Sequence, residues 1–300
     1  MADDRAKQLA DLIEPLRVPP GSKVTLAKDY DPGYKAGWRK KQGQERLRVS
    51  VESLAEYQQR LAAQETSGVL VVFQGIDAAG KDSTIRHVMS GVNPQGVVVH
   101  SFKSPSAEEL AHDFLWRCAL RLPARGQIGI FNRSHYEEVL VVRVHPQMLE
   151  AEKLPRLLTG DDLWKRRFQT INEWERHLVE SGFRIVKLFL NLSRDEQRKR
   201  FLRRIDRPDK NWKFSASDVS ERSHWDEYQH AFSQMLSHTS TEWAPWHVIP
   251  ADHKWFAHLA AGSVIAHTLM EIDPQYPRFD PEERRALQDA KRRLEAEAGG

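Results

Sequence analysis

Residues 68–82 read GVLVVFQGIDAAGKD, in which a short apolar segment runs directly into a glycine-rich turn. The segment from Gly68 to Phe73 is typical of a strand buried on both faces of a parallel sheet. The turn has the spacing G-x-x-x-x-G-K from Gly75 to Lys81, and the residues after it can form a helix. Such turns, placed between a strand and a helix, cradle phosphate groups with backbone N–H groups. A tight glycine turn without a ligand is the alternative, but the placement favours a phosphate loop.

Charged residues in this loop indicate how it would hold its ligand. Phosphate oxygens are expected on the backbone of Gly75, Ala78, Ala79 and Gly80. Lys81 would supply a mobile catalytic cation. Asp77 lies inside the loop, and Asp82 stands where Ser or Thr usually binds the metal. Because carboxylates accompany phosphate when a metal ion lies between them, the pair predicts a magnesium cofactor held by Asp77 and by Asp82.

Strand and helix patterns alternate along the rest of the chain. Further strands are expected at 97–102, 127–131, 185–190 and 246–249. Apolar residues at helical spacing occupy 45–64, 110–122, 168–178 and 225–236. A capping box formed by Asp218 and Glu221 is expected to start the last of these helices. The alternation predicts an α/β fold with a doubly wound parallel sheet flanked by helices.

Composition indicates the class of protein and the cellular compartment. With 40% hydrophobic and 29% charged residues, the 300-residue chain is typical of globular proteins, and its net charge of +3 says little about partners. No run of about 18 apolar residues occurs, so we expect no membrane partner. Cys118 is the only cysteine, and the acidic N-terminus lacks the apolar core of a secretory signal. We therefore expect a cytoplasmic protein.

A second polar motif follows the strand expected at 127–131. It reads NRSHYEE from Asn132 to Glu138. Polar residues at the carboxyl end of a strand in a doubly wound sheet face the ligand crevice. Asn132 could orient a metal-bound water, and Arg133 could bind two phosphate oxygens at once. Local hydrogen bonding in a loop is the alternative for both residues, and for His135 a structural role is favoured over a catalytic one.

A basic segment carries the third motif. Residues 184–213 hold eleven Lys or Arg and four Asp or Glu. On a helical projection, one face carries Arg200, Arg203 and Arg207 with Arg204 beside them. The opposite, core-directed face is expected to carry Phe201, Leu202 and Ile205. The helix should end near Pro208, after which Lys210 and Lys213 continue the cationic track. This pattern predicts a lid over a transferring phosphoryl group, the alternative being an ordinary solvated helix face.

Four blocks together resemble polyphosphate kinase family 2, within the P-loop kinases. They read GIDAAGKD, FNRSHYEEVLVVRVHP, RFLRRIDRPDKNWKFSASDVSERSHWDEY and TSTEWAPWHVIPADHKWFAHL. The resemblance covers about residues 20–275 and depends on the order and spacing of the blocks. It implies a thymidylate-kinase-like fold, magnesium, a homo-oligomer, and reversible phosphoryl transfer between polyphosphate and ADP or ATP.

The resemblance also assigns roles to single residues. It implies that Asp77 and Lys81 are the family's Walker A residues and that Asn132 and Arg133 are its Walker B pair. It implies phosphate-binding lid arginines at Arg203, Arg204 and Arg207. The residues around Glu137 are most similar to the class III subgroup, which uses AMP as well as ADP.

The chain is accordingly divided into three parts. Residues 1–44 are expected to be an N-terminal extension, 45–275 the phosphate-loop domain with its lid at about 194–225, and 276–300 a charged helix or tail. Two rival functions remain open. An ATP-dependent nucleoside monophosphate kinase would need a base pocket but no long cationic track. A non-enzymatic binder of polyanions would need no loop carboxylates, and its affinity would fall steeply with salt. We expect no nucleic-acid partner.

Overall fold

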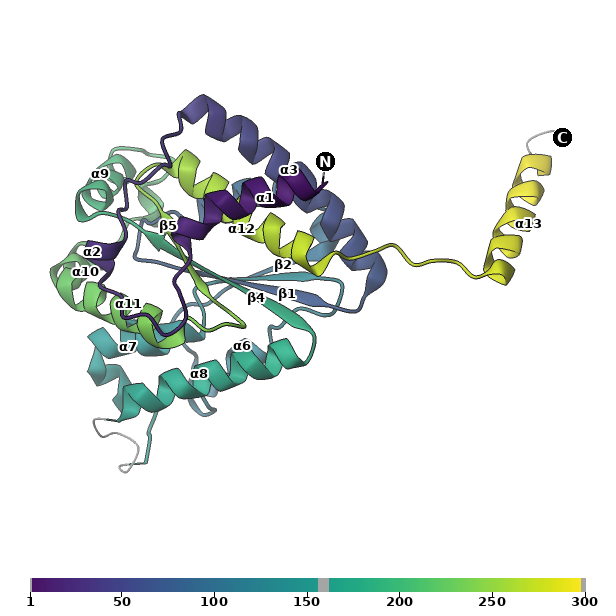
Figure 1. The fold of residues 1–300 in the computed structure, drawn as a ribbon. Helices are drawn as coiled ribbons and strands as arrows, with labels where there is room; N and C mark the ends of the chain where they lie inside the picture. The colour runs from purple at the N-terminus through teal and green to yellow at the C-terminus, as the bar shows by residue number, and fades with distance from the viewer. Residues whose placement is uncertain (1, 156–161, 298–300) are drawn as a thin grey trace.

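The computed structural model describes residues 2–155 and 162–297, which contain one five-stranded parallel sheet (Figure 1). The strand order is β2-β3-β1-β4-β5. Their bounds are β1 Gly68–Gln74, β2 Val97–Ser101, β3 Ile128–Asn132, β4 Phe183–Asn191 and β5 Trp246–Pro250. Every pairing is parallel. The predicted doubly wound parallel sheet is confirmed, and each strand lies within two residues of its expected bounds.

Helices cover both faces of the sheet. Figure 1 shows α1 (Ala2–Ile13), α3 (Lys40–Gln64) and α12 (Lys254–Ile272) on one face, and α8 (Leu163–Glu180) and α11 (Trp225–Thr239) on the other. Along β1, Val69, Val71 and Phe73 join the core cluster of the first face, whereas Leu70 and Val72 join that of the second. Because successive strand residues point to opposite faces, burial on both explains why this segment is wholly apolar.

Shorter elements connect these helices and strands. The helical ones are α2 (Leu26–Asp29), α4 (Lys81–Val88), α5 (Ala107–Leu110), α6 (Trp116–Ala119), α7 (Val141–Val144), α9 (Arg194–Ile205) and α10 (Ala216–Glu221). The 3₁₀ turns are η1 (Glu14–Leu16), η2 (Pro94–Gly96), η3 (His135–Val139), η4 (Pro146–Glu150), η6 (Asn211–Lys213) and η7 (Arg222–His224). Elements α9, η6, α10 and η7 make up the segment expected to be the lid.

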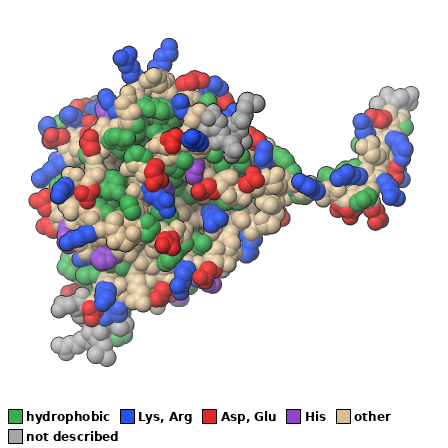
Figure 2. All heavy atoms as spheres, viewed as in Figure 1, with side chains coloured by type: hydrophobic (Ala, Val, Ile, Leu, Met, Phe, Trp, Pro, Cys, Tyr) green, Lys and Arg blue, Asp and Glu red, His purple; other side chains and the backbone are tan. Residues whose placement is uncertain are grey.

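The two ends of the chain differ in how they meet the core. Leu16, Val18 and Leu26 are buried, and the Val18 amide donates to the Trp246 carbonyl beside β5 (2.8 Å). At the other end, helix α13 (Pro281–Glu297) stands clear of the body and carries basic and acidic side chains together (Figure 2). Within residues 2–155 and 162–297, no helix is long and apolar enough to cross a bilayer.

Two local predictions were wrong. Of the helix expected over 110–122, only Trp116–Ala119 (α6) is an α-helix besides Leu110, the last residue of α5. The Leu115 amide donates to the Asp113 side chain (3.0 Å) in a turn that interrupts the helix. The capping box at Asp218 and Glu221 is also absent, since both residues lie inside α10. Glu221 instead accepts a hydrogen bond from the Tyr228 hydroxyl (2.9 Å), which is a tertiary contact.

Candidate active site

The phosphate loop lies at the carboxyl end of β1 and leads into α4. Gly75 and Gly80 adopt φ angles of 146° and 105°, in the region that favours glycine. A Cβ atom on Gly75 would lie 2.8 Å from the Leu190 carbonyl oxygen, so the loop also needs glycine for its close contact with β4. Ala78 has a φ of 64°, an uncommon conformation for a residue with a side chain. The loop therefore holds a specific backbone shape.

Lys81 is the first residue of α4, and its side chain is buried beneath the loop. Its Nζ donates to the Gly75 carbonyl at 2.7 Å. Burial, followed by the nearby Arg133 guanidinium, lowers the pKa of Lys81 to about 8, against the opposite effect of Asp77 and Glu137. A phosphate bound at the loop would favour the charged amine by adding negative charge.

Arg133 joins the loop to the turn after β3. Its guanidinium forms ion pairs with Asp77 and with Glu137, the latter at 2.8 Å. The carboxylate of Glu137, followed by that of Asp77, raises the pKa of Arg133 above its ordinary value despite burial. The backbone at Arg133 is left-handed (φ 62°), and its amide donates to the Phe73 carbonyl at 3.0 Å. Three predicted site residues thus meet at one guanidinium.

Asn132 completes the centre of the site. Its side-chain amide donates to Asp82 Oδ1 at 2.8 Å and to the Ser101 hydroxyl at 3.4 Å. These contacts join the ends of β2 and β3 to the start of α4. The structure therefore brings together the predicted residues of the phosphate loop and of the second motif, at adjacent strand ends.

Of the predicted lid cations, Arg203 and Arg207 are exposed and Arg204 is half-buried. Arg203 pairs with Glu196 at 2.7 Å, and Arg207 forms a two-pronged pair with Asp209 at 3.0 and 2.7 Å. Arg204 lies over the Phe201 ring with 5.4 Å between the guanidinium carbon and the ring centre. Lys210 is exposed, while the side chain of Lys213 lies outside the part of the chain that the structure describes.

The predicted orientation of this helix was wrong. Arg200 was expected beside Arg203 and Arg207, but it is buried, with only 6% of its surface exposed. Leu202 and Ile205 were expected in the core, but they are 48% and 44% exposed. The buried stripe of α9 is instead Gln197, Arg200 and Phe201, at spacing i, i+3, i+4. The helix is rotated because Gln197 and Arg200 find hydrogen-bond acceptors in the phosphate loop.

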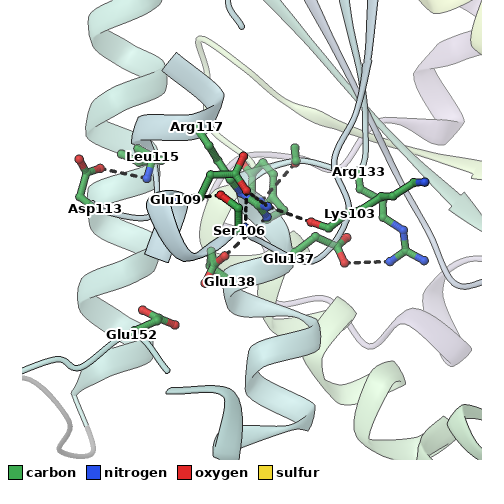
Figure 3. Close-up of polar contacts among 12 residues, drawn as sticks. Lys103, Ser106, Glu109, Asp113, Leu115, Arg117, Arg133, Glu137, Glu138 and Glu152 are labelled. Atoms are coloured by element: carbon green, nitrogen blue, oxygen red, sulfur yellow. Dashed lines mark hydrogen bonds and ion pairs between the residues drawn. The ribbon is translucent and has the colours of Figure 1, made fainter. Parts of the chain in front are cut away.

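A cavity of about 520 Å³, which the sequence did not reveal, opens beside Arg133 and Glu137 (Figure 3). Its wall includes Arg117, Glu138 and Glu152. Glu138 pairs with Arg117, and Arg167 behind the wall pairs with Glu138 and Glu152. Burial raises the pKa of Glu138 to about 7, against the opposing effect of Arg167. The four charged residues of this network come from α6, η3, the turn after η4 and α8, and no local pattern indicates that they meet.

His135 is fully buried, as a structural residue would be. The centre of its ring lies 4.5 Å from that of Tyr136, with the two planes tilted, and 4.8 Å from that of Trp174, edge to face. Beside it, Lys187 donates to Glu175 at 2.6 Å and to the Tyr136 hydroxyl at 3.0 Å. This buried pair was not anticipated, because Lys187 lies within a strand and Glu175 within a helix. Burial lowers the pKa of His135, so its ring stays neutral.

A parallel sheet in this strand order, with a glycine loop and buried lysine at the end of its central strand, defines a P-loop protein of the kinase type. The particular family follows from comparison with known proteins. The family model described as Polyphosphate kinase 2 matches residues 37–279. The chain belongs to this family.

Two curated relatives match along nearly their whole length. The chain is 51% identical over 282 residues to an ADP-polyphosphate phosphotransferase of Rhodopseudomonas palustris, covering 93% of this chain and 96% of that protein. It is 43% identical to an AMP/ADP-polyphosphate phosphotransferase of Meiothermus ruber, covering 87% and 94%. The crystal structure of Polyphosphate Kinase 2 from Arthrobacter aurescens TC1 superposes with a TM-score of 0.82 at 39% identity, covering 93% and 96%. The predicted family is therefore confirmed.

Proposed function

We propose that this enzyme transfers phosphoryl groups reversibly between inorganic polyphosphate and adenine nucleotides, forming ATP from ADP. The observation that carries the proposal is the position of the phosphate loop between two features. One is the 520 Å³ cavity, which has room for a nucleotide and is lined by Arg133 and Glu137. Arg133 also pairs with Asp77 of the loop. The other is helix α9, which contacts the loop through Arg200 and carries exposed arginines beyond it. Relatives named as polyphosphate phosphotransferases support the same activity.

The chemistry asks for positioning and for charge stabilisation. The attacking group is a nucleotide phosphate oxygen, which is already ionised at neutral pH, so no strong general base is needed. The difficulty is to bring two anions together. Lys81, the loop amides and Arg133 would stabilise the transferring phosphoryl group, and Arg203 and Arg207 would act from the lid.

Magnesium fits the residues at this site. Asp77 lies inside the loop and is paired with Arg133, and Asp82 lies in the first turn of α4 and accepts a hydrogen bond from Asn132. Magnesium in phosphoryl-transfer sites is commonly bound by one or two carboxylates together with phosphate oxygens, and we infer that these two residues hold it. When bound, the ion supplies positive charge between the carboxylates and the phosphate oxygens. Arg133 would then exchange part of its contact with Asp77 for phosphate.

AMP is proposed as a second acceptor, with Glu137 as the supporting residue. Glu137 borders the cavity and pairs with Arg133, so it lies where a shorter acceptor would meet the loop. The Meiothermus ruber relative is named for both AMP and ADP. We also propose, from the family resemblance and the single buried Cys118, that the enzyme is a cytoplasmic homo-oligomer.

The decisive assay supplies purified enzyme with ADP, long-chain polyphosphate and magnesium, and follows ATP against a Lys81→Ala control. We expect magnesium-dependent ATP formation, and with AMP the appearance of ADP and then ATP. No product above the control at several magnesium concentrations would reject the proposal. Phosphorylation of AMP from ATP alone, without any use of polyphosphate, would assign the nucleoside monophosphate kinase function instead.

A further inference from the structure

Two buried polar side chains of α9 lie against the outer side of the phosphate loop. Gln197 and Arg200 are one helical turn apart and are 1% and 6% exposed. Gln197 Nε2 donates to the Asp77 carbonyl at 3.0 Å. One Arg200 terminal nitrogen donates to the carbonyls of Ala78 at 3.0 Å and Ala79 at 2.8 Å. Three consecutive loop carbonyls are therefore held by one helix.

Arg200 is not available to bind phosphate, because each of its three side-chain nitrogens donates to an acceptor within the protein. Its Nε donates to Glu196 at 3.0 Å. Its second terminal nitrogen donates to the carbonyls of Ala251 and Asp252, just after β5. The guanidinium thus connects the loop to the segment that follows β5. Burial lowers the pKa of Arg200, and the Glu196 carboxylate opposes this shift.

Holding these carbonyls sets the direction of the loop amides. In a planar trans peptide the carbonyl of one residue and the N–H of the next point in opposite directions. Carbonyls of Asp77, Ala78 and Ala79 fixed toward α9 therefore direct the N–H groups that follow them away from α9. The Ala79 amide closes the turn onto the Ile76 carbonyl at 3.1 Å. Those of Ala78 and Gly80 are directed toward the side on which phosphate would bind.

We propose that Gln197 and Arg200 are positioning residues that hold the phosphate loop open for its ligand and couple it to the lid. Glu196 accepts from Arg200 and also from the exposed Arg203, at 2.7 Å. On the other side, Arg222 of η7 donates to the Gln197 side-chain oxygen. Both ends of the lid are thereby connected to the loop carbonyls. The inference rests on the proposed function of the loop as a phosphate site.

The alternative is that these contacts only stabilise the fold. A purely structural role would lower the melting temperature and leave the kinetic constants of the folded enzyme unchanged. A positioning role would also change phosphate binding and turnover. The two roles are separable because the nucleotide cavity is lined by neither Gln197 nor Arg200, so its affinity serves as an internal reference.

The test uses two conservative variants in the full chain. Arg200→Lys keeps the positive charge but loses the planar guanidinium, which donates both to loop carbonyls and to the carbonyls just after β5. Gln197→Glu keeps an acceptor for Arg222 but removes the donor to Asp77. Each should raise KM for polyphosphate and lower kcat by about tenfold, as displaced catalytic groups do, while KM for ADP changes less than about twofold. Calorimetric binding of inorganic tripolyphosphate should weaken in parallel.

Two other residues of α9 provide matched controls. Arg198→Lys alters an exposed arginine on the same helix and should leave every constant unchanged. Phe201→Leu alters a buried residue and should lower the melting temperature alone. If Arg200→Lys and Gln197→Glu behave like Phe201→Leu, the positioning role is rejected.

The readouts also separate this inference from the proposed function. A wild-type chain that binds tripolyphosphate but makes no ATP would reject the proposed function, and weaker tripolyphosphate binding by the variants would still support the positioning role. If one variant does not fold, the other carries the same test, because each removes a different contact to the loop carbonyls.

Discussion

At the scale of single residues, the buried amine of Lys81 makes the site sensitive to pH. The pKa of Lys81 is lowered to about 8, so the free enzyme loses this cation as the pH rises through that value. We expect kcat/KM for polyphosphate to fall above about pH 8, because kcat/KM reports ionisations of the free enzyme. Bound phosphate favours the charged amine, so the decline in kcat should begin at a higher pH. A kcat/KM that stays level from pH 7 to well above 9 would contradict this assignment.

Asp77 and Lys81 can also be tested by substitution. Lys81→Ala removes the loop cation, and Asp77→Asn keeps the shape of a residue paired with Arg133 while removing its charge. Each should lower kcat by about 10²-fold or more, as loss of a transition-state contact does. The exposed Glu45→Gln on α3 is a suitable control. Circular dichroism should show unchanged folding, and near-normal turnover would remove the substituted residue from the mechanism.

At the scale of elements, the cations of the lid should divide into two groups by their effect on the kinetic constants. Arg203→Ala and Arg207→Ala should lower kcat, because Arg203 shares Glu196 with Arg200, which contacts the phosphate loop, and Arg207 lies just beyond the end of α9. Lys210→Ala and Lys213→Ala should mainly raise KM for polyphosphate and reduce its salt dependence, by analogy with counterion release on nucleic acids. Steady-state kinetics at several salt concentrations decide this. Equal, small KM effects at all four positions would make the lid a binding surface only.

The orientation of α9 predicts that Phe201 and Ile205 contribute differently to the free energy of unfolding. Phe201 is buried, whereas Ile205, one turn later, is 44% exposed. Phe201→Ala should lower the free energy of unfolding by about 3 kcal/mol or more, as loss of a buried aromatic side chain does. Ile205→Ala should lower it by less than about 1 kcal/mol, because exposed positions tolerate truncation. Urea unfolding of both variants checks the pair, and equal losses would place Ile205 in the core.

At the scale of the whole molecule, helix α13 is separate from the catalytic body. Every residue of α13 is exposed, and the family match ends at residue 279. We therefore expect a chain ending at residue 279 to keep its melting temperature within about 2 °C, since few buried contacts are lost. Its kcat/KM should equal that of the full chain. A lower melting temperature or activity, measured together with the molar mass in solution, would show that α13 supports an assembly.

Much of the fold followed from local patterns. The five strands were recognised because each is a short, mainly apolar run, and residues 68–73 of β1 are wholly apolar because both faces of the strand are covered. The continuous helix expected over 110–122 does not form, because a side-chain turn at Asp113 interrupts a spacing that is otherwise helical. The spacing of apolar residues predicts which side chains of a helix can be buried. It does not predict a side-chain hydrogen bond that interrupts the helix.

The sequence by itself determined the phosphate loop, the strand that precedes it, and the polar residues Asn132 and Arg133 at the next strand end. Their chemistry depends on spacing within a few residues and on parallel strand ends meeting at one edge of a sheet. Only the tertiary structure decided that Arg200 faces inward, and that Arg117, Glu138 and Arg167 form an ion-pair network beside a cavity. Helical periodicity leaves the rotation of a helix about its axis open. That rotation is set by acceptors and partners far away in the chain, such as the carbonyls of Ala79 and Ala251, which hold Arg200 in place.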